Sequence, residues 1–133
     1  HLKAMRDSLQ VRLVDALGGA DGSGVRVNGP CDDAKRLPNT LNIGIKGLLA
    51  SITLMELGEL LAASAGAACH TPDAATSGGA TVSSVLEAMN VPMEYAVGTL
   101  RLSVGRHTTA EDIERGAALL IDAATRQNAG APR

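Results

Sequence analysis

Apolar residues recur with two different periods along this chain, and the alternation of the two periods limits the folds that it can adopt. A spacing of three or four residues predicts helices, in the order 2–17, 47–57, 85–89 and one that follows Thr109. A spacing of two predicts short strands, in the order 25–28, 41–46 and 100–104, and a short apolar run predicts a further buried strand at 60–63. Interleaved helices and strands predict an α/β or α+β sandwich, in which helices cover one face of a small mixed or antiparallel sheet.

Local signals predict the faces and the ends of these elements. Four apolar residues of the second helix form one stripe that we expect to face the core: Leu48, Leu49, Ile52 and Met55. The segments 84–87 and 108–111 have the form of capping boxes, with Ser or Thr at one end and Glu at the other. The composition of 71–81 predicts a mobile loop, and 128–133 is expected to be a disordered tail.

Composition excludes several classes of protein. The 133 residues correspond to one domain, and because Tyr95 is the only aromatic residue, the core must be built from Leu, Ile, Val, Met and Ala. The net charge of −2 and the lack of a basic cluster argue against a nucleic-acid partner. No apolar run reaches the roughly 18 residues of a membrane span, and no signal peptide is recognisable, so a membrane partner is not expected.

Two cysteines, Cys31 and Cys69, form neither a disulfide framework nor a zinc-binding pattern. A reducing compartment is the simpler interpretation, which indicates a cytoplasmic protein or one of an organelle. Cys69 follows a run of small residues, where a cysteine is either an exposed nucleophile on a loop or a small apolar residue of the core. An unperturbed thiol is only a few per cent ionised at neutral pH, so a nucleophile at this position needs a nearby cation or other help.

Arg101 is the clearest geometric signal among the polar residues. It lies between Leu100 and Leu102 on a predicted strand, so its side chain points away from the face that these leucines bury. A planar guanidinium on this face can bind a carboxylate, although the pattern by itself favours an ordinary solvated arginine. Asn42 alternates with apolar residues on another predicted strand in the same way.

Four segments, in order, resemble the cysteine desulfurase and selenocysteine lyase family. Residues 36–43, Arg-Leu-Pro-Asn-Thr-Leu-Asn-Ile, are similar to a strand of that family, and 64–70, Ser-Ala-Gly-Ala-Ala-Cys-His, resemble its catalytic cysteine loop. Residues 85–89 resemble the helix that follows the loop, and 100–109 resemble the strand and turn that close the active site. The Gly-Ala-Ala-Cys-His form of the loop is closest to that of selenocysteine lyases.

This resemblance implies that residues 1–127 are the C-terminal small domain of a class V aminotransferase-like enzyme of fold type I, which depends on pyridoxal phosphate. It implies that Cys69 meets the sulfur or selenium of cysteine or selenocysteine, which is removed to leave alanine. Arg101 would hold the substrate carboxylate, and Asn42 matches a position near the substrate.

The resemblance also implies that part of the enzyme is missing from this sequence. The family holds its cofactor on a lysine of a large domain, and none of the lysines here, Lys3, Lys35 and Lys46, lies in such a motif. We therefore expect an inactive fragment, a truncated gene product or a split subunit, which needs a large domain or companion chain to bind pyridoxal phosphate. A sulfur or selenium acceptor protein and a homodimeric full-length enzyme are further expectations. The alternative is a non-enzymatic α/β interaction module with an inert cysteine.

Overall fold

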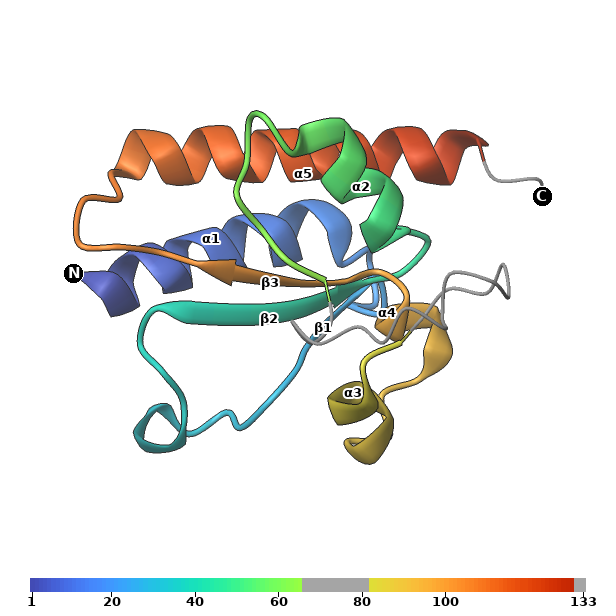
Figure 1. Ribbon diagram of the computed structural model, residues 1–133, viewed down its shortest axis with the longest axis horizontal. Coiled ribbons are helices and arrows are strands. Elements are labelled where there is room, and N and C mark those ends of the chain that lie inside the picture. Colours follow the sequence, from blue (N-terminus) through green and yellow to red (C-terminus); the bar gives the residue numbers. More distant parts are fainter. Residues whose placement is uncertain (66–81, 131–133) are drawn as a thin grey trace.

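The computed structural model describes residues 1–65 and 82–130. The elements of these residues follow one another along the chain as α1 (Leu2–Leu17), β1 (Val25–Val27), η1 (Asp33–Lys35), β2 (Thr40–Ile45), α2 (Ala50–Leu57), α3 (Ser84–Ala88), α4 (Met93–Ala96), β3 (Thr99–Ser103) and α5 (Ala110–Gly130). Figure 1 shows α1, α2 and α5 on one side of the strands, and α3 and α4 on the other side. The expected sandwich of helices and sheet is confirmed, but helices lie on both faces of the sheet and not on one face as expected.

The strands of the described residues form a three-stranded sheet in the order β1-β2-β3, with both pairs antiparallel. β2 is central because it pairs with β1 through Ile43 and Val27, and with β3 through Leu41 and Leu102. The period of two places alternate residues of each strand on opposite faces of the sheet. One face is therefore apolar, and the other carries polar and small residues.

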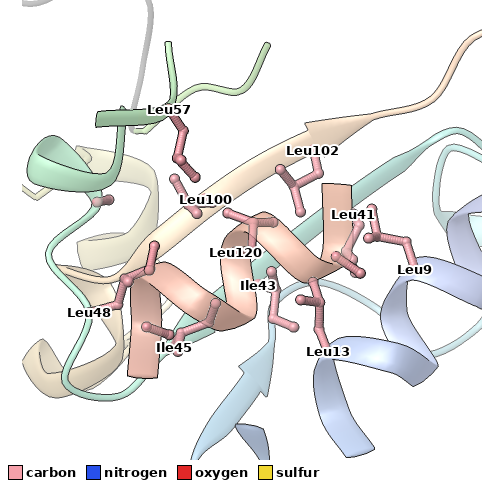
Figure 2. Close-up of a cluster of buried hydrophobic side chains, with 14 of the residues drawn as sticks. Leu9, Leu13, Leu41, Ile43, Ile45, Leu48, Leu57, Leu100, Leu102 and Leu120 are labelled. Atoms are coloured by element: carbon pink, nitrogen blue, oxygen red, sulfur yellow. The ribbon is translucent and has the colours of Figure 1, made fainter. Parts of the chain in front are cut away.

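The apolar face of the sheet is covered by α1 and α5, whose buried residues meet it in one core. Figure 2 shows leucines of α1 and α5 pointing towards the leucines and isoleucines of the strands. Leu13 of α1, Ile43 of β2 and Leu100 of β3 are completely buried. Each buried side chain of this size contributes about 1.5–3 kcal/mol relative to full exposure, so a core without Phe or Trp can still hold the sheet and helices together.

The polar face of the sheet is covered at one end by α3 and α4. A second, smaller cluster of buried residues, Leu86, Val91 and Ala96, joins these two short helices. The backbone of α4 lies close to β2, because a Cβ added at Gly44 would be 2.9 Å from the Cβ of Tyr95 and 2.8 Å from its carbonyl oxygen. The glycine therefore allows α4 to pack directly on the strand.

The apolar stripe expected for the second helix is wrong. Met55 is 86% exposed and Ile52 is 41% exposed, whereas Thr53 and Leu57 are buried. The reason is the turn before the helix: Gly47 has a φ of 79°, Leu48 enters the core ahead of the helix, and α2 begins only at Ala50. The expected stripe counted Leu48 and Leu49 as helical residues, although both precede α2. This error placed the predicted buried face on the wrong side of the helix.

The strand expected at 60–63 is also wrong. Leu60 lies in the turn that follows α2 and is 56% exposed, and the backbone joins the sheet only at Ser64, through an isolated bridge to Arg101. A continuous apolar run of four residues occurs both after a helix and in a buried strand, so the sequence pattern does not distinguish these two structures.

The helix ends differ from the expected capping boxes by one residue. Ser83, rather than Ser84, caps α3 by accepting a hydrogen bond from the backbone N–H of Val85. At α5 the Thr109 hydroxyl accepts from the N–H of Asp112, while the Asp112 carboxylate accepts from the N–H of Thr109, so the box does not involve Glu111. α5 continues to Gly130, which places 128–130 in a helix instead of the expected tail.

The loop expected at 71–81 and residues 131–133 lie outside the described residues. Among the helices that are described, none combines the length and the apolar character needed to cross a bilayer.

Candidate functional site

One row of residues crosses the polar face of the sheet and brings together the two substrate-binding residues expected from the sequence. Asn42 of β2 is the direct partner of Arg101 of β3 in the antiparallel register. Directly after the end of β1, the backbone N–H of Asn28 donates to the carbonyl of Asn42 at 2.9 Å. At the opposite edge of the sheet, Ser64 pairs with Arg101. Directly opposed residues of antiparallel strands place their side chains on the same face, about 4.5–5.5 Å apart at Cβ. We call Asn28, Asn42, Arg101 and Ser64 the polar row.

Arg101 supplies the positive charge of the polar row. Its side chain is exposed, and it makes no hydrogen bond or ion pair with any residue that the structure describes. The expected placement on the face opposite to Leu100 and Leu102 is confirmed, since both leucines are buried. No described residue therefore occupies the five donors of this guanidinium, whose planar geometry matches a carboxylate.

Ser64 connects the polar row to the cysteine-containing segment. The N–H of Arg101 donates to the carbonyl of Ser64 at 2.7 Å, and the N–H of Ser64 donates back at 3.2 Å. These two hydrogen bonds fix the start of the segment 64–70 at the edge of β3. Cys69 and His70 themselves lie outside the described residues.

Asn28 is the buried member of the polar row, and sequence reasoning missed it. Only 7% of Asn28 is exposed, and its Nδ2 donates to Asn42 Oδ1 at 2.8 Å and to Thr99 Oγ1 at 3.5 Å. Its own Oδ1 accepts from Nε of Arg26 at 3.2 Å, while the Thr99 hydroxyl donates to the carbonyl of Tyr95 at 2.8 Å. Alternation with Val27 placed Asn28 on a predicted strand, but alternation does not show which polar residues of a strand are buried.

A small cavity lies beside Asn42, between the sheet and α3. It has a volume of about 160 Å³, and its walls are Asn28, Gly29, Asn42, Val85, Leu86 and Met89. On this side the polar row therefore borders a partly open pocket, with Val85, Leu86 and Met89 as its apolar wall. A larger cavity of about 320 Å³ lies between α1, β3 and α5 and includes no residue of the polar row.

Charged residues at the start of α1 hold the segment that leads into β2. Arg6 is only 2% exposed, and it donates to the Asp7 carboxylate, to Asp33 at 2.9 Å and to the carbonyl of Leu37 at 3.1 Å. Lys3 pairs with the same two carboxylates. The hydrogen bond from Lys3 lowers the pKa of Asp7, and the hydrogen bond from Arg6 lowers the pKa of Asp33. The helical period of the sequence does not show that η1 covers this face of α1.

The remaining polar candidates do not join the polar row. Cys31 is exposed in the loop before η1, and Nε of Arg106 donates to Nε2 of the exposed His107 at 2.9 Å in the turn after β3. Within 1–65 and 82–130, no group of three His, Cys, Asp or Glu residues is arranged to hold a metal ion.

Two of the three lysines of this chain, Lys3 and Lys46, do not fit a pyridoxal phosphate site. Lys46 forms an ion pair with Glu94 at 3.0 Å, and the hydrogen bond to Glu94 raises the pKa of Lys46. Lys3 is held by Asp7 and Asp33, which also raise its pKa. An amine that forms a Schiff base must lose its proton, so a raised pKa is the opposite of what the cofactor requires.

Comparison of the sequence with known proteins identifies relatives that are named cysteine desulfurase or selenocysteine lyase. The chain is 36% identical over 116 residues to the cysteine desulfurase NifS of Azotobacter vinelandii, which covers 86% of this chain and 26% of that protein. It is also 36% identical over 116 residues to the selenocysteine lyase of Homo sapiens, with 86% and 24% of the two chains covered. The chain thus spans about a quarter of the length of these relatives. No protein-family model matches it.

Comparison of the structure gives the same fold. A NifS-like protein superposes with a TM-score of 0.69 at 20% identity, covering 95% of this chain and 28% of that one. The NifS-like protein of Rickettsia africae superposes with a TM-score of 0.66 at 22% identity, covering 93% and 28%. Over the part of the family's length that it spans, the chain belongs to the cysteine desulfurase and selenocysteine lyase family.

Proposed function

We propose that this chain is the part of a cysteine desulfurase or selenocysteine lyase that binds the substrate carboxylate and carries the reactive cysteine. The observation that supports the proposal best is the polar row. It places Asn42 next to Arg101 and fixes Ser64, at the start of the cysteine-containing segment, to the backbone of the same arginine. Residues that are far apart in the sequence are thereby gathered on one face of the sheet.

In this proposal each residue has a limited task. Arg101 binds the α-carboxylate of cysteine or selenocysteine through paired N–H groups, and Asn42 adds a further hydrogen bond beside it. Cys69 meets the sulfur or selenium that leaves the substrate. The rigid sheet under Arg101 fixes the distance between the bound carboxylate and the segment that begins at Ser64, which is what positioning of a reactant requires.

The cofactor is the part of the function that we assign to residues outside this chain. The ion-paired lysines described above support this assignment, as does the share of the relatives' length that the chain spans, 24–26%. We propose that the chain is a C-terminal domain, with a large domain or companion chain that binds pyridoxal phosphate. A homodimeric assembly and a protein that accepts sulfur or selenium complete the proposal.

Binding of L-alanine, the amino-acid product, tests the carboxylate site. In ¹⁵N-labelled chain, L-alanine should shift the Nε–H signal of Arg101, whereas ethylamine, which lacks the carboxylate, should not. Arg101→Gln should abolish binding, and Arg12→Gln, which changes an exposed arginine of α1 on the opposite side of the sheet, should leave it unchanged. Equal binding by both variants would refute the proposed site.

The reactivity of the two cysteines separates the enzyme from the alternative, a non-enzymatic interaction module. Iodoacetamide labelling followed by peptide mass spectrometry compares Cys69 with Cys31, which is exposed and serves as the internal reference. Faster labelling of Cys69 supports a reactive thiol. A Cys69 that reacts no faster than Cys31 favours the module.

A further inference from the structure

We propose that Asn28 is a positioning residue, which turns the side-chain amide of Asn42 so that its Nδ2, rather than its Oδ1, is available for a ligand at Arg101. This inference rests on the proposed function, in which the ligand group at Arg101 is a carboxylate. Asn28, the buried residue of the polar row, does not itself reach Arg101, and its proposed role is to orient Asn42.

The orientation originates at Arg26, the exposed residue at the centre of β1. Its Nε lies 3.2 Å from Asn28 Oδ1. A guanidinium has donors and no acceptor, so the atom of Asn28 that faces it must be the oxygen. The Nδ2 of Asn28 then points away from Arg26.

The two acceptors around Asn28 Nδ2 agree with this orientation. Thr99 Oγ1 lies 3.5 Å away and gives its own proton to the carbonyl of Tyr95 at 2.8 Å, so its oxygen is left to accept. Asn42 Oδ1 lies 2.8 Å from the same nitrogen. Because Asn28 is only 7% exposed, turning its amide over would bury a donor against Arg26 and oxygen against oxygen at Asn42.

Because the Oδ1 of Asn42 faces Asn28, the Nδ2 of Asn42 must point away from Asn28. Among the described residues, none accepts a hydrogen bond from this nitrogen. Asn42 is the direct partner of Arg101 across the strands, so its two N–H groups and the guanidinium form a set that contains donors only. A carboxylate accepts hydrogen bonds and does not donate them, so an Asn42 amide in the opposite orientation would place its oxygen against the ligand.

The orientation can be measured directly on the ¹⁵N,¹³C-labelled chain. A long-range HNCO spectrum detects coupling across a hydrogen bond, and the expected correlation joins Asn28 Nδ2 to Asn42 Cγ. The reverse correlation, from Asn42 Nδ2 to Asn28 Cγ, would overturn the inference. This measurement needs no ligand, so it separates failure of the inference from failure of the carboxylate site, which the L-alanine titration reports.

Substitutions at Arg26 test the link to binding without changing a buried residue. Arg26→Lys keeps a donor-only cation and should retain both the correlation and the affinity for L-alanine. Arg26→Glu supplies an acceptor, so Asn28 should turn over and the reverse correlation should appear. The affinity for L-alanine should then fall about tenfold or more, which is the effect of losing one hydrogen bond to a charged group.

Two results at Arg26→Glu would count against the inference. Weaker binding with the original correlation retained would mean that the added negative charge acts at a distance and that the amide of Asn28 plays no part. A reversed correlation with unchanged affinity would mean that the orientation of Asn42 is irrelevant to the ligand. Asn28→Asp, in which both oxygens accept, should reproduce the loss of affinity if the variant chain folds.

Discussion

Ser64 and Arg101 form a pair of backbone hydrogen bonds, 2.7 and 3.2 Å long, at the outer edge of β3. Cys69 follows Ser64 by five positions in the sequence. Five residues of fully extended chain span at most about 18 Å, so the sequence separation sets the upper limit of the distance from Ser64 to Cys69, and the two hydrogen bonds tie Ser64 to Arg101. The same strand thus carries the carboxylate-binding candidate on its side chain and the start of the cysteine-containing segment on its backbone.

Arg6 is expected to contribute strongly to stability. Arg6→Met removes the hydrogen bonds to Asp33 and to the carbonyl of Leu37, and we expect a loss of about 2–3 kcal/mol in the free energy of unfolding, because the side chain is buried but its partners are partly solvated. Urea denaturation measures the change. Arg12→Met on the same helix is the control, since Arg12 is exposed and 3.7 Å from Glu114, and it should cost less than about 0.5 kcal/mol.

Acid is expected to destabilise the chain through the carboxylates of the same network. Hydrogen bonds from Lys3 and Arg6 lower the pKa of Asp7 and Asp33 in the folded state. The unfolded state then binds more protons, so this stabilisation is complete above about pH 4 and is lost as the pH falls through the lowered values. Urea midpoints between pH 6 and pH 2.5 should show the decrease, and Asp33→Asn should make it shallower. A decrease of the same size in Asp33→Asn would assign the effect elsewhere.

The start of α5 should depend on Thr109 and Asp112, and not on Glu111. Thr109→Ala removes a hydroxyl that bonds both to the N–H and to the carboxylate of Asp112, and it should cost about 1 kcal/mol in thermal or urea unfolding. Glu111→Gln, the change suggested by the expected capping box, should alter the stability by less than about 0.5 kcal/mol. Equal losses in the two variants would contradict the observed cap.

The two faces of α2 should respond differently to truncation. Leu57→Ala removes a buried side chain from the main core and should cost about 2–4 kcal/mol. Met55→Ala changes a residue that is 86% exposed and should cost less than about 0.5 kcal/mol. The comparison of urea midpoints uses two residues of one helix, so helix propensity alone does not separate them. A large loss at Met55 would mean that its face is covered in solution.

The sequence predicted those parts of the fold in which the period alone determines burial. The strand residues Leu41, Ile43 and Leu100 alternate strictly and are all fully buried. The prediction failed at α2, because Gly47 changes the direction of the chain just before the helix and thereby alters which face meets the core. A turn with positive φ is a three-dimensional effect that a count of apolar spacings does not include.

The candidate site was predictable to the same limited degree. Alternation placed Asn42 and Arg101 on the polar face, but only the register of β2 with β3 makes them direct partners. Asn28 and Arg6 were missed because both owe their burial to neighbours from distant segments, Thr99 in one case and Asp33 in the other. Such contacts depend on the topology of the fold, and a single sequence taken alone contains no pattern that reveals them.

The packing of α1 and α5 over the same face of the sheet also bears on how the chain folds during synthesis. α1 is synthesised before the strands, yet the apolar side of β2 and β3 is not fully covered until residues 110–130 have emerged. At about 5–20 residues per second, the nascent chain exposes leucines and isoleucines of the half-built core for a second or more. We expect the docking of α5 on the sheet to be the step that removes this apolar surface from contact with other molecules in the cell.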